Sequence, residues 1–251
     1  MNTTGERTDK GAPAGCDWLV MAAHPDDAEL GMGGSMLKAV ARGLSVVIVD
    51  WTRGELGTRG NAELRMQEAA MAAKKIGLAD RIQLDLGDGY FEENRELIDR
   101  LIEVIRQYQP KVIWGNAVSD RHPDHGRASG ILRRAVFMSA LPKIQTELNG
   151  KRQEPWRVSL LGFYIQDHYH RPDLVVDITQ YSKDKEGLLL CFGSQFYRDG
   201  SSEPITPIAR PDFLPFVEAR SREMGRWIGV EFGEGFLLDR PCSVADLGLL
   251  V

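Results

Sequence analysis

The stretch that decides the fold reads WLVMAAHPDD at residues 18–27. Its first six residues are apolar, as expected for a short strand that is covered on both faces of a sheet. An imidazole and two carboxylates, His24, Asp26 and Asp27, follow this strand at once. Polar side chains at the end of a buried strand predict a functional site at the edge of a parallel sheet.

Further apolar runs alternate with helical patterns over the first half of the chain. Strands are predicted at residues 45–51, 81–86 and 111–115, and helices at 35–42, 61–76 and 94–107. Asn61 is a good N-cap for the second of these helices, and Gly77 closes it. This alternation predicts an α/β fold of the Rossmann-like, doubly wound type, with a mostly parallel sheet and helices on both faces.

The rhythm changes after residue 140, where strands are predicted at 159–166 and 174–178 and helices at 181–192 and 211–228. A chain of 251 residues with 43% hydrophobic content can bury one large core. We therefore expect residues 1–16 to form a disordered tail and residues 17–251 to form a single domain. Within that domain the core spans about 17–148, and a C-terminal α/β elaboration spans about 149–251.

Composition narrows the class of protein. The net charge is −5 and no long basic run occurs, so nucleic acid is a poor partner. No apolar stretch approaches the roughly 20 residues that span a membrane, and the polar residues 1–15 do not read as a signal peptide. The three cysteines are odd in number and lack a Cys-x-x-Cys spacing, which favours a cytoplasmic location over a disulfide framework or a thiolate metal site.

A second polar cluster, HPDH at residues 122–125, follows the fourth predicted strand. The first and fourth strands are neighbours in the usual doubly wound order, so the two clusters are expected to meet. His24, Asp27 and His125 then form a ligand set for a zinc-like ion that leaves one position for water. Iron(II) suits the same ligands. A lone His-Pro-Asp is usually a turn, but two of them after two strands predict a metal site.

The remaining residues of the two clusters suggest roles in hydrolysis. Asp26 lies beside the expected ion and is a candidate general base for its water. His122 is a candidate to stabilise a tetrahedral oxyanion or to protonate a leaving amine, with Asp124 holding it in its charged form. A third patch, HYH at residues 168–170, is interpreted as a solvated loop.

The loop after the second strand, TRGELGTRG at residues 52–60, contains three glycines and two arginines. Arg53 from this loop and Arg121 beside His122 are predicted to bind an anionic group of the substrate, because guanidinium recognises carboxylate and phosphate. Solvated arginines around a simple turn are the alternative.

The segment GMGG at residues 31–34 opens a helix after the first strand and suggests a different function. With Asp50 at the end of the second strand, it is compatible with a dinucleotide-binding module. Met36 stands where the third glycine should be, and the nearby acidic residues would repel a pyrophosphate. This alternative ranks third, and a metal-storage or scaffold protein without chemistry is also disfavoured.

The motifs AHPDD at residues 23–27, ELG at 29–31 and HPDH at 122–125 resemble the LmbE-like (PIG-L) family of zinc-dependent N-acetylglucosaminyl deacetylases. Residues 52–60, 120–127 and 233–236 are similar to the bacillithiol-biosynthesis branch, which removes acetate from N-acetylglucosaminyl-malate. The similarity runs from about residue 17 to near the C-terminus. One departure is Ala28 after the two aspartates, where the family often has Glu.

The resemblance implies one zinc per chain on His24, Asp27 and His125, with Asp26 as general base. It implies a small anionic amino-sugar conjugate as substrate and a homo-oligomer, trimer or hexamer. The second candidate is a deacetylase or amidase of another N-acylated amino sugar or thiol conjugate, such as a mycothiol precursor or a chitin fragment.

The resemblance also assigns the residues around the metal. It implies that His122 acts as oxyanion partner or acid and is oriented by Asp124. Arg53 and Arg121 would meet the anionic aglycone.

Overall fold

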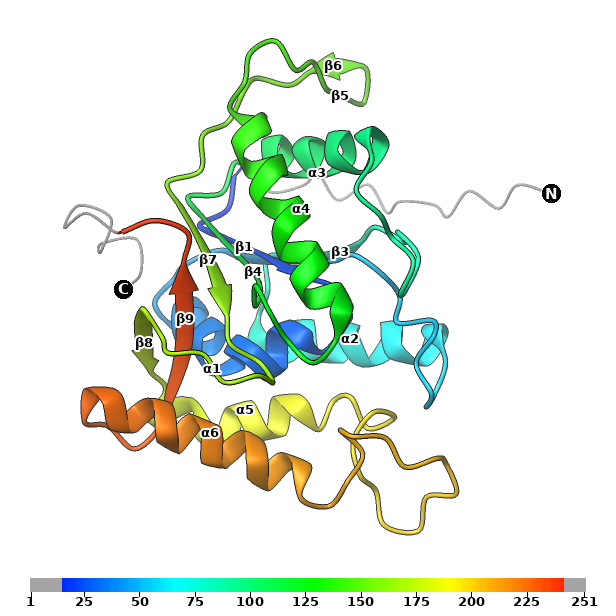
Figure 1. Cartoon of the computed structure of the whole chain (residues 1–251), viewed down its shortest axis with the longest axis vertical. Helices are drawn as coiled ribbons and strands as arrows, with labels where there is room; N and C mark the ends of the chain where they lie inside the picture. The colour runs from blue at the N-terminus through cyan, green and yellow to red at the C-terminus, as the bar shows by residue number, and fades with distance from the viewer. Residues whose placement is uncertain (1–14, 242–251) are drawn as a thin grey trace.

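The computed structural model describes residues 15–241, which fold around one seven-stranded sheet (Figure 1). The predicted tail at residues 1–16 falls almost wholly outside the described residues. The strand order is β3-β2-β1-β4-β7-β9-β8. The strands are β1 (Trp18–Ala22), β2 (Val46–Asp50), β3 (Asp80–Gln83), β4 (Val112–Asn116), β7 (Leu160–Tyr164), β8 (Leu174–Asp177) and β9 (Gly233–Leu238).

The pairs among β3, β2, β1, β4 and β7 are all parallel, and only β9 runs antiparallel to its neighbours β7 and β8. The mostly parallel α/β fold is therefore confirmed. Because β7 pairs with β4 in parallel, the C-terminal part of the chain continues the same sheet. Its division from the core near residue 149 stays a prediction.

Helices cover both faces of the sheet, as Figure 1 shows. They are α1 (Asp27–Ala41), α2 (Ala62–Ile76), α3 (Arg95–Tyr108), α4 (Pro123–Ser139), α5 (Ser182–Leu189) and α6 (Phe213–Ile228), with a 3-10 turn at η1 (Thr179–Tyr181). Alternate residues of β1 divide between the two cores, as the period of two in a strand requires. Leu19 and Met21 pack with α3 and α4, whereas Trp18 and Val20 pack with α1, α2 and α5.

Several elements differ from the expectation. Helix α4, strand β9 and a small hairpin of β5 (Glu147–Leu148) and β6 (Lys151–Arg152) were not predicted. Helix α1 begins at Asp27 instead of residue 35. The predicted caps of α2 are present, since Asn61 accepts a hydrogen bond from the Leu64 N–H and Gly77 adopts a φ of 82°.

The glycines at the start of α1 serve packing. A Cβ at Gly34 would lie 2.9 Å from the side chain of Ile178. The N–H groups of Gly34 and Ser35 donate to the carboxylate of Glu234 at 2.9 and 2.7 Å. Asp50, the acidic residue on which this alternative also relied, is paired with Arg81. These partners oppose the dinucleotide-binding alternative, because they occupy the groups that a nucleotide would need.

The strand order changes sides between β1 and β4: β2 and β3 follow β1 on one side, and β4 and β7 lie on the other. β1 and β4 pair in parallel. Their carboxyl ends share one edge, where ligands bind in folds of this class. His24 follows β1 after one residue, and His122 follows β4 through a short loop. The topology therefore brings the two polar clusters to one place.

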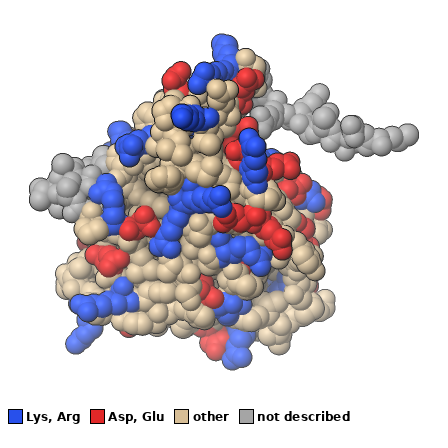
Figure 2. All heavy atoms as spheres, turned by 45° about the horizontal axis from the view of Figure 1, so that its top comes forward, with Lys and Arg blue, Asp and Glu red and all other residues tan. Residues whose placement is uncertain are grey.

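The surface around the β5–β6 hairpin carries charges of both signs. Lys and Arg lie beside Asp and Glu there (Figure 2), and pairs such as Arg133–Asp239 join opposite charges. Within residues 15–241, every helix is too short or too polar to cross a bilayer.

Candidate functional site

The three predicted metal ligands meet at the carboxyl edge of the sheet. His24 Nδ1 lies 3.3 Å from Asp27 Oδ2, and His125 Nε2 lies 3.2 Å from Asp27 Oδ1. The side chains of all three are at most 8% exposed. Ring nitrogens of His24, His122 and His125 lie within 4.8 Å of one another. Segments a hundred residues apart thus converge on Asp27, and their role as ligands remains a prediction.

Each of the two candidate histidine ligands has a carboxylate on its other ring nitrogen. His24 Nε2 lies 3.0 Å from Asp88 Oδ1 and 3.2 Å from Asp124 Oδ2. His125 Nδ1 lies 2.8 Å from Asp120 Oδ2. Metal-binding histidines usually donate their second N–H to a carboxylate, which fixes the tautomer and the ring. This arrangement leaves His24 Nδ1 and His125 Nε2 facing Asp27.

The charge balance of the cluster fits a divalent cation. Five aspartate side chains, each at most 7% exposed, lie in or against it: Asp26, Asp27, Asp88, Asp120 and Asp124. Burial alone would lower the pKa of His125, but Asp27 and Asp120 outweigh it and raise the pKa to about 9. The pKa of His24 is raised in the same way by Asp124, Asp27 and Asp88. A group of carboxylates that stabilises positive charge on its neighbours in this way is suited to bind a metal ion.

Asp26 occupies a strained and buried position beside the ligands. Its φ of 109° is positive, which is uncommon for a residue other than glycine and is typical of functional sites. Burial raises the pKa of Asp26 to about 7, although the charge of Arg65 opposes this. A carboxylate with a pKa near neutrality can accept a proton at physiological pH.

Arg65 is a residue of the candidate site that no sequence pattern predicted. Its Nη2 donates to Asp26 Oδ2 at 3.0 Å and to the Pro25 carbonyl at 2.8 Å, and its Nη1 donates to the Gly54 carbonyl at 3.3 Å. It therefore joins the candidate base to the glycine-rich loop. Arg65 lies within the helix predicted at residues 61–76, where an arginine is usually solvated, so no sequence signal singled it out.

His122 is the N-cap of α4, and its Nδ1 accepts the Asp124 backbone N–H at 3.3 Å. Its ring centroid lies 4.5 Å from that of His24. Burial and the charges of His24 and His125 lower the pKa of His122. At neutral pH its imidazole is therefore neutral, and the hydrogen-bonded Nδ1 places the proton on Nε2.

Asp124 does not hold His122 in the way that the sequence analysis expects. Its Oδ2 lies 3.2 Å from His24 Nε2 and accepts the Gly89 N–H at 2.9 Å, while its Oδ1 pairs with Arg127. Because α4 begins at Pro123, Asp124 falls in its first turn and its carboxylate points to the β1 loop. Asp124 thus orients His24 in the structure.

The two predicted anion-binding arginines lie in exposed ion pairs. Arg53 Nε is 3.3 Å from Asp85 Oδ1, and Arg121 Nε is 2.8 Å from Asp167 Oδ2. Both arginine side chains are about two-fifths exposed, at 42% and 43%. They are therefore accessible, but the structure does not bring their guanidinium groups onto Asp27.

The loop at residues 168–170 supports the centre through its backbone. The N–H of the exposed His168 donates to Asp120 Oδ1 at 2.8 Å, and Asp120 in turn contacts His125. Tyr169 is 60% exposed. This agrees with the interpretation of the segment as a solvated loop.

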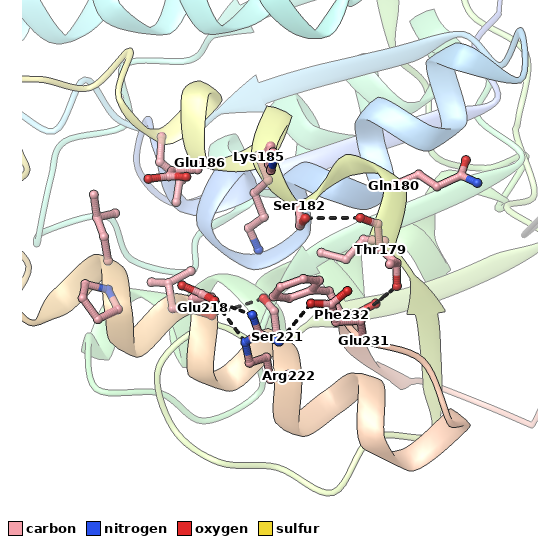
Figure 3. A pocket seen from close by; sticks show the side chains of 16 residues that line it. Thr179, Gln180, Ser182, Lys185, Glu186, Glu218, Ser221, Arg222, Glu231 and Phe232 are labelled. Carbon is pink, nitrogen blue, oxygen red and sulfur yellow. Dashed lines mark hydrogen bonds and ion pairs between the residues drawn. The ribbon is translucent and has the colours of Figure 1, made fainter.

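A separate cavity of about 540 Å³ lies between α5 and α6, away from the cluster (Figure 3). Thr179, Ser182 and Lys185 line one side of it, and Glu218, Ser221 and Arg222 line the other. None of its lining residues belongs to the His24–Asp27–His125 group. The candidate active site is therefore assigned to the polar cluster and not to this cavity.

Comparison with known proteins agrees with this geometry. A family model described as PIG-L, GlcNAc-PI de-N-acetylase, matches residues 19–136, which contain both polar clusters. The crystal structure of a conserved protein from Thermus thermophilus is 35% identical, with a TM-score of 0.81 over 91% of this chain and 96% of that one.

Two curated relatives have named activities. A diacetylchitobiose deacetylase from Thermococcus kodakarensis is 28% identical over 72% of this chain and 70% of its own length. A 1D-myo-inositol 2-acetamido-2-deoxy-alpha-D-glucopyranoside deacetylase from Streptomyces scabiei is 28% identical over 56% of this chain. The match spans 53% of that second relative, about half of its length.

Proposed function

The chain belongs to the PIG-L, or LmbE-like, family of deacetylases, and on this basis we propose that it hydrolyses the acetamide of an N-acetylglucosaminyl conjugate. Water adds to the acetyl carbonyl, the C–N bond breaks, and acetate and the free amine are released. The observation that carries the proposal is the meeting of His24 and His125 on the two oxygens of Asp27. Asp26 lies next to this group in sequence and is buried with it.

The donor set of His24, Asp27 and His125 would hold one zinc per chain, and a bound zinc would polarise the carbonyl and acidify the attacking water. Iron(II) is the other candidate for these ligands. Asp26 takes the proton from the water, since it directly precedes Asp27, is buried with it and is held by Arg65.

His122 is assigned to the oxygen on which negative charge develops. Its Nδ1 accepts the Asp124 N–H, so its Nε2 carries the proton and can donate a hydrogen bond. A neutral imidazole with a lowered pKa is a poor acid, which favours the role of oxyanion partner over that of proton donor. The proton that Asp26 takes from the water goes to the nitrogen as the C–N bond breaks, so the amine leaves in neutral form. The carboxylate of Asp124 contributes through His24, and its backbone N–H through His122.

The substrate class follows from the relatives, which are named for a chitobiose and for a glucosaminyl-inositol. Within this class we propose N-acetylglucosaminyl-malate, the bacillithiol precursor, as substrate. Exposed ion pairs are worth about 0–1 kcal/mol, so a malate carboxylate can replace Asp85 on Arg53 or Asp167 on Arg121. Neutral conjugates, a chitin fragment or a mycothiol precursor, are the second candidates. A trimer or hexamer remains a prediction.

The test is acetate release from N-acetylglucosaminyl-malate, N-acetylglucosaminyl-inositol and diacetylchitobiose, each with and without a chelator. We expect the malate conjugate to give the highest kcat/KM and the chelator to abolish turnover. The R53A and R121A variants are expected to lose more activity on N-acetylglucosaminyl-malate than on plain N-acetylglucosamine. No acetate from any of the three conjugates contradicts the proposed reaction, and equal losses on both substrates contradict the anionic aglycone.

A further inference from the structure

We propose that two amide side chains, Asn116 and Gln166, position the carboxylate of Asp27 and thereby set how tightly the centre holds its metal. We call them the amide pair. Asn116 is the last residue of β4, and Gln166 follows β7 by two residues. The inference rests on the proposed function, because it concerns the metal site in it.

The amide pair contacts both oxygens of Asp27. Asn116 Nδ2 donates to Oδ2 at 3.0 Å, and Gln166 Nε2 donates to Oδ1 at 2.8 Å. The His24 backbone N–H also donates to Oδ2, at 2.9 Å. Hydrogen bonds to an ionised acceptor are about twice as strong as neutral ones. The carboxylate is therefore held at both ends before any ion arrives.

The orientation of each amide follows from its partners. Asn116 Oδ1 accepts the Ala23 N–H at 2.8 Å, so the opposite end of the amide, Nδ2, must face Asp27. For Gln166, the reversed amide would set two oxygens against each other at the same short distance. Both amides consequently present N–H groups to Asp27.

Asn116 also links three elements at the carboxyl ends of the neighbouring strands β1 and β4. Ala23 directly follows β1, Asp27 begins α1, and Asn116 ends β4. The side chain of Asn116 thus ties the end of one central strand to the end of the other through the first residue of the helix. This fixes where Asp27 stands relative to His24 and His125.

Neutral donors suit this place because the cluster already contains five aspartates. An aspartate or glutamate in the amide pair would add a buried like charge, and an apolar residue would remove one of the hydrogen bonds that Asp27 accepts. Partners of metal ligands typically change metal affinity by about 10- to 100-fold when they are mutated. The amide pair is expected to act on this scale.

The test is the zinc dissociation constant of the full chain, measured by competition with a chelator. We expect Gln166→Leu and Asn116→Ala to weaken zinc binding by about 10- to 100-fold. Asn116→Ala also removes the acceptor of the Ala23 N–H, so Gln166→Leu, which acts on Asp27 alone, decides the case. Circular dichroism would check that the variants are folded.

Gln153 offers a matched control. It is 9% exposed, as Gln166 is, it donates through Nε2 to the Glu103 carbonyl, and its Oε1 is buried without a partner, like that of Gln166. Gln153→Leu is expected to leave the zinc affinity unchanged.

Unchanged zinc affinity in folded Gln166→Leu overturns the inference, as does an equal loss in Gln153→Leu. The proposed function fails separately: a wild-type chain that binds zinc tightly and releases no acetate contradicts the reaction and leaves the amide pair standing.

Discussion

At the scale of single residues, the candidate centre depends on how its buried aspartates divide their partners. Asp27 takes two amides and two imidazoles, whereas Asp26 takes the guanidinium of Arg65. Asp88 and Asp120 each contact a histidine at the ring nitrogen that faces away from Asp27. In the proposed reaction, neighbouring carboxylates therefore have different tasks: one holds the metal, one acts as the base, and the others support the histidine ligands.

The role of Asp26 can be tested with Asp26→Asn, which keeps the shape of the side chain and removes its basicity. We expect kcat to fall by about 10²- to 10⁴-fold, the usual contribution of a general base. The zinc content should stay at that of the wild type, because the two histidines and Asp27 are intact. A near wild-type kcat, measured as acetate release, would contradict the assignment of Asp26 as the base.

Sequence patterns could predict part of this residue-scale arrangement. His24, Asp27 and His125 stand in two compact motifs that each follow a strand, so topology alone predicts that they converge. Asp88 is a single acid in a loop, and no motif sets it apart from a solvated one. Asp120 opens the stretch at residues 120–127, but nothing in that stretch indicates its contact with His125. Asn116 carried a weak signal, since it is a polar residue that ends the buried strand β4.

At the scale of elements, helix α1 is interrupted where it leaves the site. Met32 has a non-helical φ of −146°, and beyond it the Gly34 and Ser35 N–H groups donate to Glu234. Glu234 also pairs with Lys185 of α5 at 2.7 Å, and both side chains are at most 7% exposed. Strand β9 and helix α5 thus hold the helix that begins at Asp27.

Glu234→Gln is expected to cost about 3–5 kcal/mol of unfolding free energy, because it leaves the buried Lys185 charge without a counter-charge. Adding Lys185→Met to this variant should restore part of that loss, since the uncompensated charge is then gone. Urea unfolding measures both effects. The exposed pair Arg210–Asp212 gives the control: Asp212→Asn should change nothing. A loss no larger for Glu234→Gln than for Asp212→Asn would refute the role given to Glu234.

There are physical reasons why the sequence did not predict the start of α1 or helix α4. Three glycines early in α1 lower its helix propensity, and they are needed because Tyr164, Leu188 and Ile178 pack directly on them. Helix α4 contains Pro123, Gly126 and Gly130, which read as a loop, although proline suits the first turn of a helix. By contrast, α3 has a clear apolar stripe and was predicted almost to its ends.

At the scale of the whole molecule, the two ends of the parallel strands have different roles. The polar cluster lies at their carboxyl ends. At their amino ends, Asp17 precedes β1, accepts hydrogen bonds from the Ser45 N–H and hydroxyl, and pairs with Lys111. These residues precede β1, β2 and β4, so this group joins three strands. This group is therefore expected to contribute to stability without acting on the site.

The pH dependence of stability tests this division. Burial would raise the pKa of Asp17, but hydrogen bonds from Lys111 and Ser45 outweigh it and lower the pKa below 3.8. A lowered carboxyl pKa contributes stability above the unfolded value, and this contribution is lost as pH falls through the folded value. Asp17→Asn should therefore cost on the order of 1 kcal/mol at neutral pH.

Urea unfolding of both proteins across the acid range shows the sign. The difference between wild type and Asp17→Asn should hold from neutral pH down to about pH 4 and shrink below it. A difference that grows as the pH falls would contradict the account of this group. Acetate release at neutral pH should be the same for both proteins, because Asp17 lies away from the cluster.

The central claim is that His24, Asp27 and His125 hold one metal ion on which deacetylation depends. The direct measurement is a titration of metal-free protein with zinc, followed by the rate of acetate release from an N-acetylglucosaminyl conjugate. We expect no turnover without metal and a linear rise in rate that ends at one equivalent of zinc per chain. A full rate from the metal-free protein would contradict it.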